Sequence, residues 1–228
     1  MVRSQKMDKD VPVTIVTPDS YDGSVPMPVL YLLNGWSGDH RHWLERGKVG
    51  CLADRYEVIL VMPDTGYDSW YFDSKVTPEY QYETFVSNEL VEYVDSNYKT
   101  IADRCGRAVT GLSMGGRHTQ YIGFRNPELF GSLGILSAAL TAADEKAFGE
   151  DAVAMGRDAK ALKDAAFDYI FIGAGVYETN DSARHTLLHK QLEELGVKHD
   201  YYIGGFSAHD FMTWRHLLYF QFMPNLWK

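Results

Sequence analysis

A serine placed between glycines is the first feature of this sequence that could do chemistry. Residues 111–116 read GLSMGG, so Ser113 lies in a G-x-S-x-G pattern. This pattern is typical of a nucleophilic serine on a sharp turn from a strand into a helix, where the residues two before and two after it must be small. Residues 108–112 have the composition of a strand and residues 114–125 that of a helix. The sequence therefore predicts that Ser113 is the nucleophile.

A serine hydroxyl needs a general base, usually an imidazole that a carboxylate orients. In folds with this turn, the acid and then the histidine follow the serine along the chain, each in a loop after a strand. Of the eight histidines, only His209 lies directly after the last predicted strand and before a C-terminal helix, so we expect it to be the base. The others precede the serine, lie within helices or lie at the amino end of a strand, and are expected to be surface or packing residues: His40, His42, His118, His185, His189, His199 and His216.

Two carboxylates compete for the role of the acid. Glu178 and Asp181 both lie in the loop at residues 173–181, which follows the predicted strand at residues 169–172. Glu178 is favoured because it comes sooner after the strand, and because Asp181 is placed to be the N-cap of the next helix. Asp210 is adjacent to His209 in the chain and is interpreted as structural.

Acyl transfer also needs backbone N–H groups that bind the developing oxyanion. The residue after the nucleophile, Met114, is expected to supply one of them. The second usually comes from the loop after an early strand, and residues 29–33 run into a glycine-punctuated loop, NGWSGD. Gly35 or Trp36 is expected to carry this second N–H.

Short apolar runs alternate with longer segments of helical periodicity, which is the pattern of a parallel sheet with helices on both faces. The expected strands are residues 11–17, 29–33, 58–62, 108–112, 133–137, 169–172 and 201–203. The expected helices are residues 77–98, 114–125 and 183–195 and a segment after His209. With no linker or repeat, residues 1–228 are expected to form a single domain. Few residues separate the strands at 133–137 and 169–172, which predicts a minimal lid.

Composition excludes several classes of function. Asp and Glu outnumber Lys and Arg by 31 to 22, and without a basic cluster a nucleic-acid partner is not expected. No apolar run approaches the roughly 18 residues of a membrane span. Cys51 and Cys105 lack metal-ligand spacing and are expected to be buried. No metal or cofactor is therefore expected, and the oligomeric state and the cellular compartment stay open.

Taken together, these motifs resemble those of the esterase D-like branch of the α/β-hydrolases. This branch includes tributyrin and acetyl esterases, feruloyl esterases, S-formylglutathione hydrolases and the mycolyltransferase antigens. The resemblance covers nearly the whole chain and rests on residues 28–35, 69–71, 111–116 and 126–130, and on His209 with Trp214 five residues later. It implies an α/β-hydrolase fold with a mostly parallel, twisted sheet of about seven to eight strands.

The resemblance also implies roles for single residues. The family's second oxyanion donor follows a His-Gly or Asp-Gly pair, which maps to Trp36, and its acid comes three residues after a loop glycine. Counting from Gly175 gives Glu178, with Asp181 still open as the alternative. Two departures are Asn34, where the family usually has His, and a Glu where Asp is more frequent.

Aromatic residues in the loops are suited to a ligand cleft, and Trp70, Tyr71 and Trp214 are expected to contact the substrate. The chain begins within the family's first strand, which suggests a trimmed, exported precursor.

The expected function is that of a serine carboxylesterase acting on short-chain acyl, acetyl or feruloyl esters, with a small-molecule or carbohydrate-linked substrate. The short lid argues against a lipase or a mycolyltransferase. One alternative is a thioesterase of the S-formylglutathione kind or an acyltransferase. A non-catalytic binding protein that keeps the fold is the third class.

Overall fold

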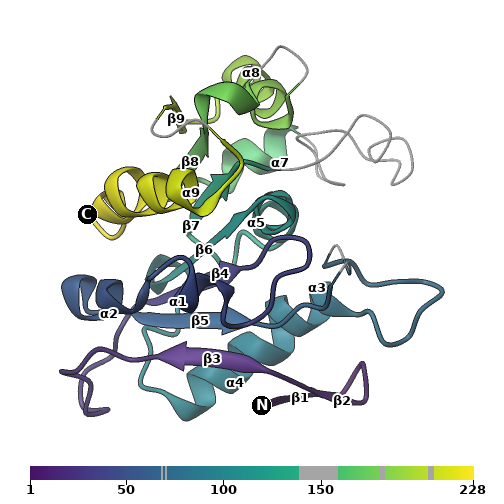
Figure 1. Ribbon diagram of the computed structural model, residues 1–228, viewed down its shortest axis with the longest axis vertical. Coiled ribbons are helices and arrows are strands. Elements are labelled where there is room, and N and C mark those ends of the chain that lie inside the picture. The colour runs from purple at the N-terminus through teal and green to yellow at the C-terminus, as the bar shows by residue number, and fades with distance from the viewer. Residues whose placement is uncertain (68, 70, 139–158, 180–182, 205–207) are drawn as a thin grey trace.

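A seven-stranded sheet organises the chain in the computed structural model, which describes residues 1–67, 69, 71–138, 159–179, 183–204 and 208–228 (Figure 1). The strand order is β3-β5-β4-β6-β7-β8-β9. The strands are β3 (Val13–Val16), β4 (Val29–Leu33), β5 (Ile59–Pro63), β6 (Arg107–Leu112), β7 (Ser132–Leu136), β8 (Tyr169–Ala174) and β9 (Asp200–Ile203). Only the pairing of β3 with β5 is antiparallel, so the prediction of a mostly parallel sheet is confirmed.

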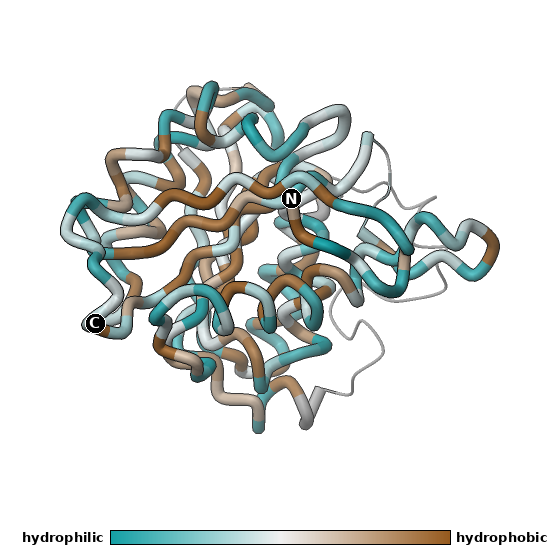
Figure 2. The backbone as a smooth tube through the Cα atoms, turned by 90° about the horizontal axis from the view of Figure 1, so that it is seen from below, coloured by the Kyte–Doolittle hydropathy of each residue, from teal (hydrophilic) through white to brown (hydrophobic). Residues whose placement is uncertain are grey.

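Helices cover both faces of this sheet. One face packs against α4 (Leu90–Asn97), α5 (Met114–Arg125), α7 (Ala159–Asp164) and α8 (Arg184–Leu195), and the other against α1 (His42–Glu45), α2 (Gly50–Tyr56) and α9 (Phe211–His216). Along β4, Tyr31 contributes to the first cluster and Leu30 to the second, because neighbouring side chains of a strand point to opposite faces. Strands β4 to β7 are buried along their whole length, as continuous apolar runs predict. Figure 2 shows these hydrophobic stretches running along the strands.

The parallel register aligns the carboxyl ends of five strands at one edge of the sheet. The aligned pairs are Leu33 with Gly111, Leu112 with Leu136, Leu136 with Gly173, and Ala174 with Ile203. The loops that follow β4, β6, β7, β8 and β9 therefore start from the same edge, where ligands of open α/β sheets usually bind.

The helix expected at residues 77–98 begins five residues later than predicted. It starts with α3 (Tyr82–Thr84), continues as a π-helical turn, η1 (Phe85–Glu89), and ends with α4. Tertiary contacts hold the preceding residues in a loop, since the Gln81 amide donates to the Ser74 carbonyl at 2.8 Å and Asp73 accepts from the Thr84 N–H at 3.1 Å. These bonds replace the first turn that the sequence pattern suggested.

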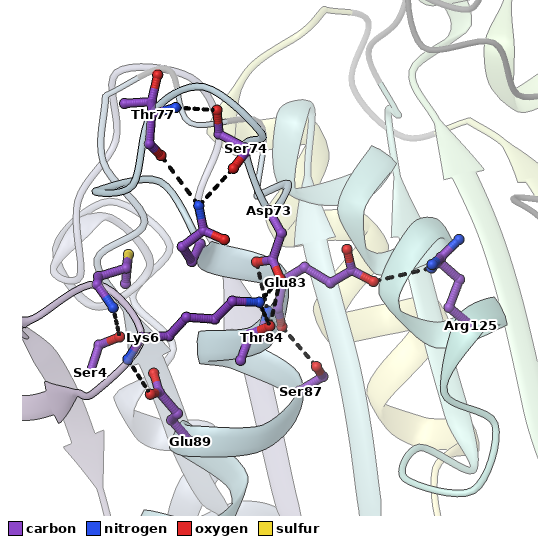
Figure 3. A network of polar contacts seen from close by, with 12 residues as sticks. Ser4, Lys6, Asp73, Ser74, Thr77, Glu83, Thr84, Ser87, Glu89 and Arg125 are labelled. Atoms are coloured by element: carbon purple, nitrogen blue, oxygen red, sulfur yellow. Dashed lines mark hydrogen bonds and ion pairs between the residues drawn. The ribbon is translucent and has the colours of Figure 1, made fainter.

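The strand expected at residues 11–17 is divided at Pro12, which has no N–H for a strand ladder. Before it, β1 (Val2–Ser4) and β2 (Lys9–Val11) form a separate two-stranded sheet. The turn of this hairpin is attached to the rest of the protein (Figure 3): Lys6 Nζ lies 2.5 Å from Asp73 and 2.7 Å from Thr84 Oγ1, and the Lys6 N–H donates to Glu89.

The remaining elements are short turns of helix: η2 (Arg104–Gly106), η3 (Val176–Glu178), η4 (Leu217–Phe222) and η5 (Met223–Asn225). The prediction of buried cysteines is wrong, because Cys51 in α2 and Cys105 in η2 are both exposed free thiols. Each lies on the solvent side of a short element. Among the described residues, no helix is long and apolar enough to cross a membrane.

Candidate active site

Ser113 occupies a strained turn between β6 and α5. Its backbone angles are φ 55° and ψ −115°, and residues other than glycine rarely adopt such a positive φ. The turn is closed so tightly that a Cβ on Gly111 would lie 2.4 Å from the Gly115 carbonyl oxygen. A Cβ on Gly115 would lie 2.4 Å from the Leu33 oxygen, and one on Gly116 2.4 Å from the Leu136 oxygen. The glycines of the sequence pattern are therefore sterically required.

The structure brings His209 to this serine from the loop after β9. His209 Nε2 lies 2.8 Å from Ser113 Oγ, although 96 residues separate them in the chain. The other ring nitrogen, Nδ1, is hydrogen-bonded to Glu178 Oε1. Trp214 packs edge-on against the imidazole, with the ring centroids 5.0 Å apart. Asp210 caps α9 by accepting from the Thr213 N–H at 3.0 Å, which agrees with its structural interpretation.

Glu178 lies in η3, immediately after β8, and uses both carboxylate oxygens. Oε1 faces His209, while Oε2 accepts from the Gly175 N–H and from Ser137 Oγ, each at 2.8 Å. Burial opposes the charged form, but the hydrogen bonds from His209, Gly175 and Ser137 outweigh it and hold the pKa of Glu178 below its ordinary value. This carboxylate is therefore ionised at neutral pH and oriented by three donors.

Ser137 is a residue that sequence reasoning missed. It directly follows β7 and has a positive φ of 45°, which turns the chain at the edge where the other site residues lie. A polar residue immediately after a buried strand was the available signal. The alternative acid, Asp181, lies outside the described residues. The N-cap position of α8 belongs to Ala183, which makes no side-chain cap.

The two expected oxyanion donors flank Ser113. Met114 is the first residue of α5, so its N–H has no acceptor within the helix. Trp36 follows Gly35 in the loop after β4, and a Cβ on Gly35 would lie only 3.4 Å from Ser113 Cβ. Trp36 is 53% exposed, and its ring packs against Tyr67 with a centroid distance of 4.8 Å. The loop after β4 and the start of α5 thus meet at the serine.

A pocket of about 330 Å³ opens beside these residues. It is lined by Gly35, Trp36, Ser37, His42, Arg46, Leu112, Ser113, His209, Asp210, Phe211 and Trp214. Trp214, expected to contact the substrate, is part of this wall. No pattern in the sequence predicted that His42, Arg46 and Phe211 line the pocket, although Phe211 is close to His209 in the chain.

Tyr71, one of the other two aromatic residues expected to contact the substrate, does not line this pocket. Tyr71 is fully buried, and its hydroxyl donates to the backbone oxygen of Asn34 in the loop that carries Trp36. Trp70 lies outside the described residues. Among the described residues there is also no group of three or more His, Cys, Asp or Glu side chains that could hold a metal ion.

The histidines expected to have packing or surface roles, apart from His42, lie outside the pocket lining. His118 and His185 are buried, and burial lowers the pKa of both. His40 is hydrogen-bonded to Thr14 and His189 to His199, each pair away from Ser113.

Comparisons with known proteins agree with this geometry. A family model described as "Putative esterase" matches residues 4–222. The chain is 34% identical over 200 residues to an endo-1,4-beta-xylanase/feruloyl esterase of Xylanibacter ruminicola, covering 84% of this chain and 25% of that protein. It is 33% identical to an acetyl esterase of Caldicellulosiruptor saccharolyticus, covering 50% of this chain and 42% of that protein. The chain therefore spans well under half the length of these curated relatives.

The same relationship holds in three dimensions. A solved ferulic acid esterase superposes with a TM-score of 0.79 at 25% identity, covering 99% of this chain and 95% of that one. The fluorophosphonate-binding serine hydrolase FphF of Staphylococcus aureus superposes with a TM-score of 0.81 at 19% identity, covering 99% of this chain and 96% of that one, and this likeness concerns the fold.

Proposed function

Because this chain belongs to the Putative esterase family, we propose that it is a serine carboxylesterase that hydrolyses short-chain acyl, acetyl or feruloyl esters. The α/β-hydrolase fold predicted from the sequence is confirmed. The observation that carries the proposal is the unbroken series of hydrogen bonds from Ser113 through His209 to Glu178 at the wall of a pocket. This is the arrangement that activates a hydroxyl as a nucleophile.

In the proposed reaction, Ser113 Oγ attacks the ester carbonyl carbon while His209 Nε2 takes the hydroxyl proton. The carbonyl oxygen becomes an oxyanion, which the N–H groups of Met114 and Trp36 bind. Ionised Glu178 keeps the proton on His209 Nδ1 and stabilises the imidazolium. When the carbon–oxygen bond to the alcohol breaks, His209 gives its proton to the leaving oxygen. Water then attacks the acyl-enzyme, with His209 again as base, and releases the acid and free Ser113.

The pocket supports a small acyl group. Its volume of about 330 Å³ is at the lower end of the range of ligand sites, which is roughly 300–1,000 Å³. Three aromatic side chains, Trp36, Phe211 and Trp214, contribute to its lining. An acetyl group, or one planar aromatic acid, suits such a wall. Two relatives carry the names feruloyl esterase and acetyl esterase, which agrees with either choice.

A substrate panel tests the proposal. Nitrophenyl esters from acetate to octanoate would be compared with methyl ferulate, acetylated xylan and S-formylglutathione, using the wild type and Ser113→Ala. We expect hydrolysis of short or aromatic esters and a loss on the order of 10⁴-fold in kcat in the variant. Far faster turnover of S-formylglutathione would favour the thioesterase alternative. No turnover, together with no fluorophosphonate labelling of Ser113, would leave a binding protein.

A further inference from the structure

Buried hydrogen bonds to Asn34 fix the start of the loop that carries Trp36. Asn34 is 1% exposed, and its backbone oxygen lies 2.9 Å from the hydroxyl of Tyr71. Its side-chain oxygen lies 3.1 Å from the same hydroxyl and accepts from Thr65 Oγ1 at 2.9 Å. Its side-chain nitrogen donates to the carbonyl of Gly35 at 3.0 Å. The peptide groups just before Trp36 are therefore fixed by polar contacts that water does not reach.

Tyr71 also contacts the opposite side of the oxyanion site. Its ring stacks on His118 in α5, with the centroids 4.5 Å apart and the planes 28° apart. His118 Nδ1 lies 3.1 Å from the carbonyl oxygen of Met114. Burial holds the pKa of His118 well below its usual value, so the stacked ring is neutral. One buried side chain thus joins the loop that carries Trp36 to the first turn of the helix that begins at Met114.

The segment around Tyr71 is itself anchored. The Tyr71 N–H donates to Ser69 Oγ at 3.1 Å. Two residues further on, Asp73 is bonded to Thr84 and to Lys6, as Figure 3 shows. Tyr71 is therefore a fixed support for the loop and not a side chain that follows the loop's own movement.

We propose that Tyr71 is a positioning residue for the oxyanion hole, whose hydroxyl sets the place of the Trp36 N–H relative to that of Met114. This inference rests on the proposed esterase function. Oxyanion donors must lie within a narrow range, about 2.7–3.1 Å, of the oxygen as it becomes charged. A small shift of the loop at Asn34 weakens one donor while it leaves the nucleophile Ser113 and the base His209 in place.

The test is Tyr71→Phe, which keeps the ring that stacks on His118 and removes only the hydroxyl. Tyr31→Phe is the matched control. Tyr31 lies in β4, three residues before Asn34, is also fully buried, and its hydroxyl has no hydrogen-bond partner among the described residues. Both variants lose one buried hydroxyl, so the comparison isolates the bonds to Asn34.

Two readouts separate positioning from a merely structural role. One is kcat and KM on a short nitrophenyl ester, and the other is the Ki of a short trifluoromethyl ketone, whose adduct with a serine carries an oxyanion. We expect Tyr71→Phe to lower kcat about ten- to hundredfold with little change in KM, which is less than the 10²–10³-fold loss on removing a whole donor. The Ki should rise by a similar factor. Tyr31→Phe should match the wild type in both.

A second variant, Thr65→Val, removes the bond from Thr65 Oγ1 to Asn34 Oδ1. Like Tyr71→Phe, it should lower kcat and raise Ki, but by a smaller factor. It decides the matter if Tyr71→Phe does not fold. Equal kcat and Ki in the wild type, Tyr71→Phe and Thr65→Val would overturn this inference and leave the esterase proposal intact. A wild type that neither turns over esters nor binds the ketone would overturn both.

Discussion

Replacing Glu178 with glutamine tests the proposed site at the level of single atoms, because the two side chains have nearly the same shape. In the wild type, Oε2 accepts from two donors, the Gly175 N–H and Ser137 Oγ, each at 2.8 Å. The Gly175 N–H is fixed in the backbone, so the amide oxygen of the variant must take the Oε2 position. The amide NH₂ group then faces His209 Nδ1, where the wild type has an acceptor.

This geometry reverses the tautomer of the imidazole. With a donor opposite Nδ1, His209 carries its proton on Nε2 and cannot accept one from Ser113. An asparagine in place of the corresponding acid of another serine hydrolase leaves the geometry intact but lowers kcat about 10⁴-fold for this reason. We expect a loss of similar size here, about 5 kcal/mol in activation free energy. The melting temperature should fall by no more than a few degrees, since the amide fills the same space.

The assay is kcat on a short nitrophenyl ester, with melting temperature as the check on folding. Glu193→Gln is the matched control, because Glu193 lies on α8 with a side chain 62% exposed and pairs with His189 at 3.4 Å, away from Ser113. It should retain wild-type turnover. If Glu178→Gln kept more than about a tenth of the wild-type kcat, Glu178 would not be the group that fixes the tautomer, and Asp181 would be the next acid to test.

Gly115→Ala should lower the free energy of unfolding, measured by urea denaturation, by about 1–3 kcal/mol, because the new Cβ would lie 2.4 Å from the Leu33 oxygen. Gly50→Ala is the control and should not lower it, because its Cβ would lie 3.4 Å from Leu44. Equal effects of the two substitutions would contradict the steric argument. Because the pKa of Glu178 is lowered, its charge stabilises the fold at neutral pH, and this contribution disappears as pH falls through the folded-state pKa, below the usual value of about 4.3. The gap in melting temperature between the wild type and Glu178→Gln should therefore narrow as the pH is lowered below about 4.3, and a constant gap would argue against this stabilising charge. Finally, kcat/KM should peak at acyl chains of about two to four carbons. Each CH₂ that the pocket of about 330 Å³ buries adds roughly 0.8 kcal/mol of binding free energy, but only until the pocket is full. A preference for octanoate would refute this prediction.

Local patterns in the sequence predicted the central elements well. The helix at Met114–Arg125 was predicted to the residue, because the glycine turn marks its start and Asn126-Pro127 marks its end. The buried strands were placed within one or two residues, since their apolar runs are continuous. Ser113, His209 and Glu178 could be selected because their order and their positions after strands are properties of the chain alone.

Contacts between distant segments account for what the sequence did not reveal. The role of Ser137 depends on β7 lying beside β8, and the burial of Tyr71 depends on a bond to Asn34, 37 residues earlier. The loop before α3 depends on Gln81 reaching back to Ser74. The cysteines were expected to be buried because of their apolar character. That character does not tell which side of a short helix faces solvent, and both thiols are exposed.

The strained backbone at Ser113 also bears on how this protein can evolve. A residue held at φ 55° and ψ −115° costs of order 1–3 kcal/mol, and the substitution that would relieve the strain, glycine, removes the nucleophile. Selection for heat resistance therefore meets a trade-off at this position between stability and activity. Adaptation to higher temperature must proceed through the sheet, the helices and the surface, while the turn itself stays unchanged across any lineage that keeps the reaction.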